Sequence, residues 1–324
     1  MEIVHPDPVR ATSTATTPRV DRARNPFVPM DRTYPSRSEP SQLGCRCMDV
    51  VEAHVRRLPP LDERWDPRSH DRADLAQALL LGGVAGTATH PLDNVRGNIL
   101  MLIDHDPDKL FGLSGLPGGF DLDDILSMVE VGAGAPIDHD ERFGPVDIRP
   151  EPVLDVCAAF GDRLRTATER KQTVVLATGH PTGLALFYHR LDGWLVQRGA
   201  QVVAPAHGAR WRDPRLHHDW FIDHWGGVGM LTDGREPRHT HWPDAMRRML
   251  AEVTPDLVLA DHGFAGAAIE AGVETLSIAD VNDPALLVAQ AQGRTEHVLV
   301  MDDHVDPAAY WPCFQAIAAS WDTA

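Results

Sequence analysis

The chain lacks the features of a membrane, secreted or nucleic-acid-binding protein. No uninterrupted apolar stretch approaches the length of a membrane span. The first residues, Met1–Pro6, show neither the basic nor the apolar region of a secretory signal. Basic residues number 30 against 47 acidic ones, and the formal net charge of −17 repels phosphate backbones. We therefore expect a cytoplasmic protein with no membrane and no nucleic-acid partner.

Cysteine is scarce, and the four residues present do not form a disulfide framework (Cys45, Cys47, Cys157 and Cys313). Cys45 and Cys47 are too close for an easy bridge, and no second pair completes a zinc site. We expect these thiols to be reduced, as in a cytoplasmic protein.

Several familiar hydrolase motifs are also missing. The sequence has no Gly-x-Ser-x-Gly elbow and no His-Glu-x-x-His helix, which argues against a serine acyl hydrolase and a zincin. Asp121-Leu122-Asp123 resembles the paired aspartates of haloacid dehalogenases. However, no hydrophobic strand precedes it and no threonine follows in place, so we predict the start of a helix there.

The pattern along the chain predicts three regions. Residues 1 to about 40 are rich in Pro, Thr, Ser and Arg and predict a disordered arm. Residues 41–170 predict a helical subdomain, with helices over 71–81, from Pro91, over 121–131 and over 153–170. Residues 171–324 alternate strands with helices and predict a Rossmann-like catalytic domain. The fold class is therefore α/β, a largely parallel sheet with an N-terminal helical subdomain.

Five apolar, β-branched runs in the last region end on polar clusters. In an open α/β sheet, ligands bind outside the carboxyl ends of the strands. His, Asp and Asn at these ends therefore predict one polar site and an enzyme. The runs cover 173–178, 201–205, 256–260, 274–279 and 297–301.

The loop after the first run, Thr178-Gly179-His180, predicts an anion cradle. Thr182 lies in the first turn of the next helix, whose free N–H groups would point to the sheet edge. The loop has no Walker lysine and no dinucleotide glycine fingerprint, so the alternative is an ordinary turn. His207, after the second run, is a further candidate for phosphate binding.

Between Trp220 and His241 the sequence predicts a hairpin with its turn at Asp233-Gly234. On its second strand, His239 and His241 would face the same side and could share a metal or flank an anion. The alternative is two exposed surface histidines. We expect the preceding segment, 207–225, to form a lid.

The remaining strand ends carry carboxylates that could hold a hard cation. Two adjacent carboxylates, as in Asp302-Asp303, cannot both be buried without a cation or protonation. Such an oxygen-rich set suits Mg²⁺ or Mn²⁺. Helix capping is the alternative for Asp261 and Asp283. The predicted metal ligands are Asp261, Asp280, Asn282 and Asp303.

Two amides in the helical region, Asn94 and Asn98, are four residues apart and share a helix face. Because a buried amide must be satisfied, they either pin the helix to the sheet or reach into the site and bind substrate.

Several of these motifs together resemble a family of mostly actinobacterial proteins called simply "phosphatase". The similarity covers roughly residues 75–315 and implies phosphate-ester hydrolysis, without indicating the substrate or the catalytic residues. The motifs are Thr89–Asn94, Pro107–Leu113, Ala177–Pro181, His239–His241, Pro255–Gly266, Ala279–Leu286 and Asp302–Val305.

We therefore predict a metal-assisted phosphatase acting on a phosphomonoester of a small soluble metabolite. His180 would bind phosphate, and His239 or His241 would stabilise charge or protonate the leaving alcohol. His262 is the fourth catalytic candidate. The alternatives are a non-hydrolytic binder of a sugar- or nucleotide-like phosphorylated ligand, or an enzyme that modifies one. A homodimer would fit the prevalence of twofold assemblies.

Overall fold

The computed structural model describes residues 71–214 and 216–322. Its contacts group Arg64–Ala324 into one compact unit. The predicted arm over residues 1–40 and the Cys45-Arg46-Cys47 segment lie outside the described residues. Cys157 and Cys313 are free and buried. In the described part of the chain, no helix has the length and apolar character needed to cross a membrane.

The centre of the unit is a mostly parallel sheet, which confirms the predicted α/β class. Its main path runs β10-β9-β8-β3-β7-β6-β5, and β4 pairs with β3 alone. The strands from β10 to β7 are parallel, whereas β6 and β5 add an antiparallel extension. The bounds are β3 Thr173–Thr178, β4 Gln201–Val202, β5 Arg210–Asp213, β6 His218–Trp225, β7 Val228–Thr232, β8 Leu257–Asp261, β9 Thr275–Ala279 and β10 His297–Val300.

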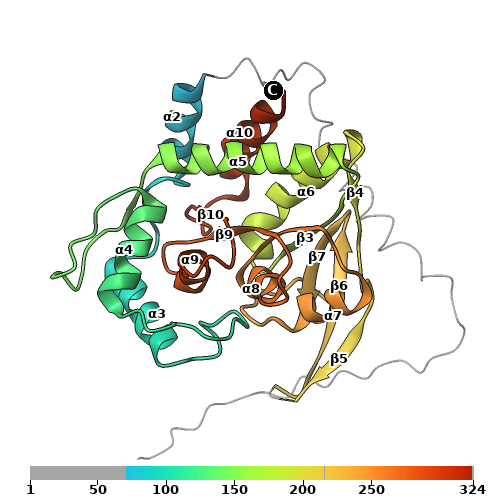
Figure 1. Cartoon of the computed structure of the whole chain (residues 1–324), viewed down its shortest axis with the longest axis horizontal. Coiled ribbons are helices and arrows are strands. Elements are labelled where there is room, and N and C mark those ends of the chain that lie inside the picture. The colour runs from blue at the N-terminus through green and yellow to red at the C-terminus, as the bar shows by residue number, and fades with distance from the viewer. Residues whose placement is uncertain (1–70, 215, 323–324) are drawn as a thin grey trace, which may run out of the picture. The chain divides into compact units, whose positions relative to one another are not determined.

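Helices cover both faces of the sheet (Figure 1). On one face α8 and α9 pack against the strands, with α7, α3 and α4 outside them. On the other, α6 packs against β3 and β7, and α10 contacts α6 and α5. The bounds here are α6 Pro181–Gln197, α7 Asp244–Glu252, α8 His262–Glu270, α9 Pro284–Ala291, the 3₁₀ turn η2 Pro307–Tyr310 and α10 Trp311–Asp322.

The order in which successive strands are added to the sheet reverses between β3 and β8, which are parallel to each other. From β3 the chain passes through α6 to β7 on one side, and from β8 it passes through α8 and α9 to β10 on the other. This arrangement is the switch point of a doubly wound sheet, outside which ligands bind. The turns after β3 and β8 therefore become the first place to look for a site.

The predicted helices of the N-terminal region are confirmed, with bounds shifted by a few residues. They are α2 Arg72–Gly82, α3 Leu92–Ile103, α4 Leu122–Ala133 and α5 Pro150–Glu169. Asp121 caps α4 through a capping box with Asp124, which explains the Asp-rich start of that helix. A short ladder between β1 Gly86–Thr87 and β2 Asp147–Ile148 links the segments. Two of the apolar runs predicted as strands, β8 and β9, are buried along their full length because both faces of the sheet are covered. The prediction for 201–205 is wrong in extent, because that run forms only the short β4 and its residues are mostly not buried.

The predicted turn at Asp233-Gly234 is present, because Asp233 accepts from the amides of Arg235 and Glu236 and closes a local turn. Beyond it the described residues form only one isolated antiparallel bridge, between Thr232 and Pro237. A longer hairpin joins β6 to β7 through Gly226 and Gly227, with Gly226 at φ 63° and the Gly227 amide bound to Asp192 at 2.8 Å. Pro237 has no N–H to continue a ladder. The predicted strand through His239 and His241 is therefore an extended loop.

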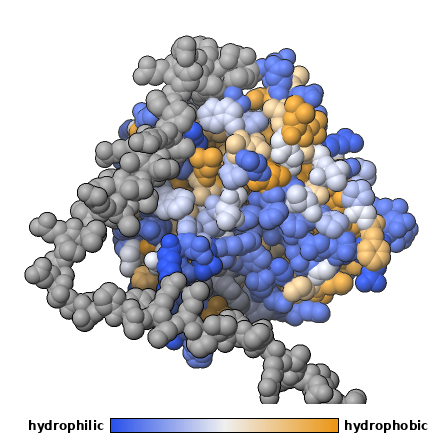
Figure 2. Space-filling view, turned by 180° about the vertical axis from the view of Figure 1, so that it is seen from behind, coloured by the Kyte–Doolittle hydropathy of each residue, from blue (hydrophilic) through white to orange (hydrophobic). Residues whose placement is uncertain are grey.

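The surface is predominantly polar on the side shown in Figure 2, where apolar side chains occur in small separate groups. The exposed large apolar residues belong to several different helices, among them Leu81 of α2, Val131 of α4 and Val196 of α6. Single exposed apolar side chains are common on protein surfaces and need no binding partner to explain them.

Candidate active site

A hydrogen bond joins the two turns at the switch point. Gly179 donates its amide to Asp261 Oδ1 at 2.7 Å, and His180 donates its amide to Thr178 Oγ1 at 3.0 Å. A Cβ at position 179 would lie 2.5 Å from the Thr240 carbonyl oxygen. Glycine is therefore required here by the close approach of a third segment. Thr178 shapes the turn through the bond that its hydroxyl oxygen accepts from the His180 amide.

His262 stands at the centre of the site as the first residue of α8. Its φ of 46° is unusual for a side chain of this size and aims the imidazole back over the sheet edge. Nδ1 lies 2.9 Å from Asp261 Oδ1, and Nε2 lies 3.5 Å from Asp283 and 3.7 Å from Asp303. Burial alone would lower the pKa of His262, but Asp283, Asp261 and Asp303 together raise it to about 10.

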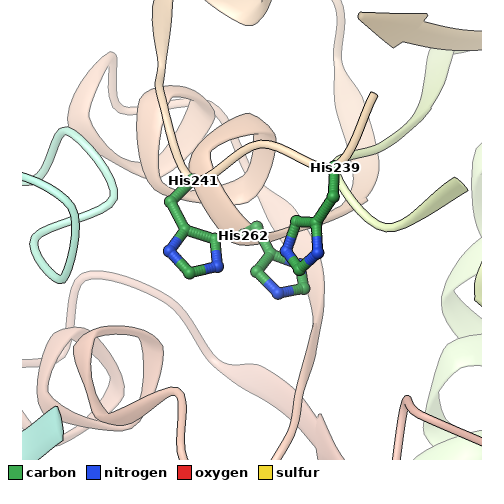
Figure 3. A group of neighbouring side chains, drawn as sticks. All are labelled: His239, His241 and His262. Carbon is green, nitrogen blue, oxygen red and sulfur yellow. The ribbon is translucent and has the colours of Figure 1, made fainter. Parts of the chain in front are cut away.

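Two further imidazoles meet His262 from the loop after β7 (Figure 3). The ring centroids of His239 and His241 lie 4.9 Å and 5.0 Å from that of His262, and 4.9 Å from each other. Thr240, between them, is buried and donates its amide to the Gly179 carbonyl at 2.8 Å. The strand prediction was wrong, yet the extended loop still places both histidines on one side.

His180 completes the histidine cluster from the start of α6. Its Nδ1 lies 3.1 Å from Asp303 Oδ2, and its ring stacks on His304 with a centroid distance of 6.0 Å. Burial lowers the pKa of His180, but Asp303 more than offsets this and the pKa is raised. The pKa of Asp303 is lowered despite its burial, because His180 and His262 lie beside it.

His239 differs from its neighbours in charge. Burial, followed by repulsion from His262, His180 and His241, lowers its pKa to about 3. It is therefore neutral near pH 7 and has a lone pair available for a proton or a metal ion.

Some buried polar atoms of the cluster make no well-directed hydrogen bond among the described residues. Asp261 Oδ2 is one, and His180 Nδ1 and Asp303 Oδ2 are two more, although these last two lie 3.1 Å from each other as an ion pair. A buried unsatisfied carboxylate oxygen is costly, so such atoms mark places where a ligand, ion or water binds.

Asp283 is a site residue that the sequence analysis weighed partly as a helix cap. It precedes α9, but its side chain makes no capping hydrogen bond. Its Oδ2 accepts from the Asp280 amide at 3.1 Å and faces His262 Nε2. The capping alternative for Asp261 fails in the same way, since that side chain caps no helix.

The predicted metal ligands do not all face this cluster. Asp261 and Asp303 border His262, as described above. Asp280 is instead hydrogen-bonded to His90 Nδ1 at 2.5 Å, which raises the pKa of His90. Asn282 donates its side-chain amide to Asn94 at 3.0 Å, and Asn98 donates to the Asn282 carbonyl at 2.8 Å. Of the two roles considered for the α3 amides, these contacts favour pinning the helix to the loop after β9.

The adjacent carboxylates of Asp302 and Asp303 are both buried. Asp302 accepts from the Thr89 amide and hydroxyl at 2.6 Å and 3.0 Å, and from the His304 amide at 2.9 Å. Its role is structural. Asp303 lies 3.1 Å from His180 and 3.7 Å from His262, and these imidazoles lower its pKa despite its burial.

Two other predicted site residues, His207 and Thr182, make no hydrogen bond, ion pair or ring contact with the histidine cluster in the described part of the chain. His207 pairs with Asp223 at 3.5 Å and packs against His224 on the antiparallel extension. Thr182 is in the first turn of α6 and its side chain is exposed. Segment 207–225, predicted as a lid, instead contributes β5 and β6 to the sheet.

Asp108 is a site residue that the sequence reasoning missed. Its Oδ2 lies 2.8 Å from His241 Nδ1, and that hydrogen bond holds the pKa of Asp108 well below its usual range. A carboxylate partner fixes Nδ1 as the protonated nitrogen of His241 and leaves Nε2 for the site. Phe111, from the same loop, packs against the rings of His241 and His262. The one signal for Asp108 was its place in the Pro107–Leu113 motif.

Three helices begin at this edge of the sheet without a side-chain cap, namely α6, α8 and α9. Their N-termini add positive potential and, in α6 and α8, free first-turn N–H groups. Together with His262 and His180, whose pKa values are raised by the neighbouring carboxylates, they offset part of the buried negative charge. The arrangement suits an anion.

Fold and site together define an α/β protein with a cluster of ionisable side chains at a topological switch point. The chain belongs to the Phosphatase family, whose model matches residues 70–320. It is 30% identical over 251 residues to "Phosphatase SCO2771" of Streptomyces coelicolor, a similarity that covers 76% of this chain and 94% of that protein.

Proposed function

We propose that this chain hydrolyses phosphomonoesters of a small soluble metabolite at the cluster formed by His180, His239, His241, His262 and Asp303. The observation that carries the proposal is the convergence of uncapped helix N-termini and paired histidines at the switch point. Membership of the Phosphatase family supports the reaction class.

In this proposal the turn after β3 and the start of α8 bind the phosphate. His180 donates to a phosphoryl oxygen, and the first-turn amides of α6 and α8 bind the others. Because these groups are held by the Gly179–Asp261 hydrogen bond, they need little rearrangement when charge develops in the transition state.

In this proposal His239 and His241, on the loop after β7, transfer the protons. His241 acts as an imidazolium, with its Nδ1–H held by Asp108, and gives its Nε2 proton to the leaving alcohol, which leaves it as the neutral imidazole. His239, which is neutral near pH 7, accepts a proton from the attacking water or binds a metal ion. Phe111 and α8 exclude solvent from one side of these rings.

A divalent cation fits the donors present. Two groups of donor atoms lie close enough to bind one, His239–His241–His262 and His262–Asp283–Asp303, and the second group adjoins unsatisfied carboxylate oxygens. This mixed imidazole and carboxylate set favours Mn²⁺ or another transition metal over Mg²⁺, which prefers oxygen ligands. Such an ion would polarise the phosphoryl group and lower the pKa of a bound water.

The test is release of inorganic phosphate from a panel of sugar, nucleoside and amino-alcohol phosphates. Each substrate is assayed with Mn²⁺, Mg²⁺ or Zn²⁺ and again with EDTA. We expect release from at least one monoester, stimulated by a metal and abolished by EDTA. Release that is unaffected by EDTA would remove the metal from the proposal. Ligand-induced stabilisation without any release would contradict hydrolysis and favour a binding protein.

A further inference from the structure

A cleft lined by tryptophans adjoins the histidine cluster. Its volume is about 170 Å³, and His239 and Thr240 form the wall that it shares with the site. Trp211, Trp220 and Trp242 contribute indole rings, with aliphatic side chains between them. No step of the proposed hydrolysis uses this cleft, so its composition needs a separate explanation.

The antiparallel extension of the sheet builds the cleft. Trp211 of β5 and Trp220 of β6 are directly opposite in the ladder, so their side chains lie on the same face. On the other side of β6, Leu231 of β7 is directly opposite Ile222. Ile222 is two residues from Trp220 on β6, so Leu231 lies on the same face of the sheet as Trp220 and diagonal to it. The antiparallel extension therefore places aromatic side chains next to the doubly wound part of the sheet, which contains the switch point.

His239 and Thr240 separate the cleft from the histidine cluster, so they fix the orientation of any ligand that occupies both the cleft and the cluster. Thr240 is buried and bound to Gly179, so the histidines on either side of it are held at a fixed place. The His239 ring lies 4.6 Å from that of His180. An ester whose phosphoryl group binds at His180 would therefore direct its organic group past His239 toward the tryptophans.

We propose that this cleft binds the organic group of the phosphate ester, and that this group is a flat apolar ring. The inference rests on the proposed hydrolysis and names its substrate class. A cavity of roughly 150 Å³ is enough to hold benzene in a protein interior, so one ring fits here. Indole faces bind such rings by stacking and edge contacts.

The charged groups around the cleft favour a ring over a cationic group. Asp213 and Asp244 also line it, but each already takes part in another interaction. The Arg248 guanidinium lies 4.4 Å from the Trp211 ring and packs on that indole. A cationic ligand would meet this guanidinium nearby, whereas an apolar ring would not be repelled.

The test compares benzyl phosphate with ethyl phosphate, whose alcohols are similar leaving groups, and with choline phosphate. We expect the wild type to prefer benzyl phosphate in kcat/KM. Trp220→Ala should lower kcat/KM for benzyl phosphate at least about tenfold and leave ethyl phosphate within about twofold. Trp220→Phe should restore most of the loss. Trp225→Ala is the matched control, because Trp225 is on the same strand but exposed and outside the cleft.

Equal losses for benzyl and ethyl phosphate in Trp220→Ala would overturn the inference, as would a preference for choline phosphate. If the wild type releases phosphate from no ester, the proposed hydrolysis fails and the cleft is tested by binding. Benzylphosphonate and ethylphosphonate are then titrated by calorimetry. Tighter binding of the benzyl compound, lost in Trp220→Ala, supports the cleft independently, and absence of that difference overturns it.

Discussion

Gly179 donates its amide to the carboxylate of Asp261 across 2.7 Å, and this bond ties together the two turns on either side of the switch point. The same glycine accepts from Thr240 through its carbonyl and thereby holds the loop that carries His239 and His241. Three segments that are far apart in the chain thus meet at one residue without a side chain.

Gly179→Ala should therefore damage both stability and turnover. The new Cβ would lie 2.5 Å from the Thr240 carbonyl oxygen and 3.0 Å from His262 Cβ, so the loop must move. We expect a loss of about 1–3 kcal/mol in the free energy of unfolding, typical of overpacking, measured by urea denaturation. Gly97→Ala is the control, because nothing lies within 4 Å of a Cβ at that helical position. It should be neutral or stabilising by up to ~1 kcal/mol. Equal effects of the two variants would contradict this account.

Much of the fold followed from the apolar pattern. The run 173–178 is β3 along its full length, and the strand ends carry the polar clusters to one edge. The extent of the hairpins did not follow. The chain turns at Asp233-Gly234 as its sequence indicates, but among the described residues only one antiparallel bridge forms beyond that turn, between Thr232 and Pro237. The turn between β6 and β7, at Gly226, depends on a contact with Asp192 of α6, which a local pattern does not reveal.

The site was harder to predict in its details than in its position. Strand ends identified His180, Asp261, His262 and Asp303 as neighbours, since parallel strands bring their carboxyl ends together. Which oxygen faces which partner depends on tertiary contacts. Asp283 has the sequence context of a cap but turns toward His262. Asp108 is 133 residues from its partner His241, so no spacing rule could pair them.

The neighbours Asp302 and Asp303 should respond differently to replacement by asparagine. In the wild type the Asp302 carboxylate accepts hydrogen bonds from three donors with its two oxygens. The Asp302→Asn side chain has only one acceptor oxygen, so we expect a loss of ~1–3 kcal/mol in the free energy of unfolding. Asp303→Asn removes a carboxylate from the cluster, so turnover and any rise in melting temperature on adding Mn²⁺ should disappear. Calorimetric melting with and without Mn²⁺ measures the loss of stability in Asp302→Asn and the loss of the Mn²⁺ response in Asp303→Asn, and phosphate release measures turnover. The interpretation is wrong if Asp303→Asn responds to Mn²⁺ as the wild type does.

Asp108→Asn should lower kcat while the fold is retained. The carboxylate is partly exposed and acts by orienting His241, and removal of such a supporting group typically costs about 10–100-fold. The pH profile of kcat should also change, because the leaving-group proton comes from His241 in this account. Asp93→Asn, at an exposed position of α3, is the control and should retain wild-type kcat and pH profile. An unchanged pH profile in Asp108→Asn would argue against His241 as the acid.

Stability should depend on pH through Glu270, away from the site. Burial by itself would raise the pKa of Glu270, but hydrogen bonds from Ser114 and Arg294 lower it from 4.5 to about 2. A depressed pKa in the folded state contributes stability above the ordinary pKa, and this is lost as the pH falls toward the folded value. Glu270→Gln should therefore be less stable by ~1 kcal/mol near neutral pH, since the pair is partly exposed.

That deficit should shrink as the pH is lowered from about 5 toward 3, measured as the difference in urea midpoint between variant and wild type. Glu141→Gln, at an exposed position, should show no deficit at any pH. A deficit for Glu270→Gln that stays constant over this range would show that the carboxylate charge does not contribute.

The most direct test of the central claim is phosphate release by His239→Gln. His239 is neutral near pH 7 and lies on a loop, so its replacement by neutral glutamine should not affect folding. Its ring nevertheless lies within 5 Å of three other imidazoles of the cluster. The account predicts a fall in kcat of at least about tenfold at an unchanged melting temperature. His297→Gln, at the opposite end of β10, should retain wild-type kcat. Wild-type turnover by His239→Gln would contradict the assignment of hydrolysis to this cluster.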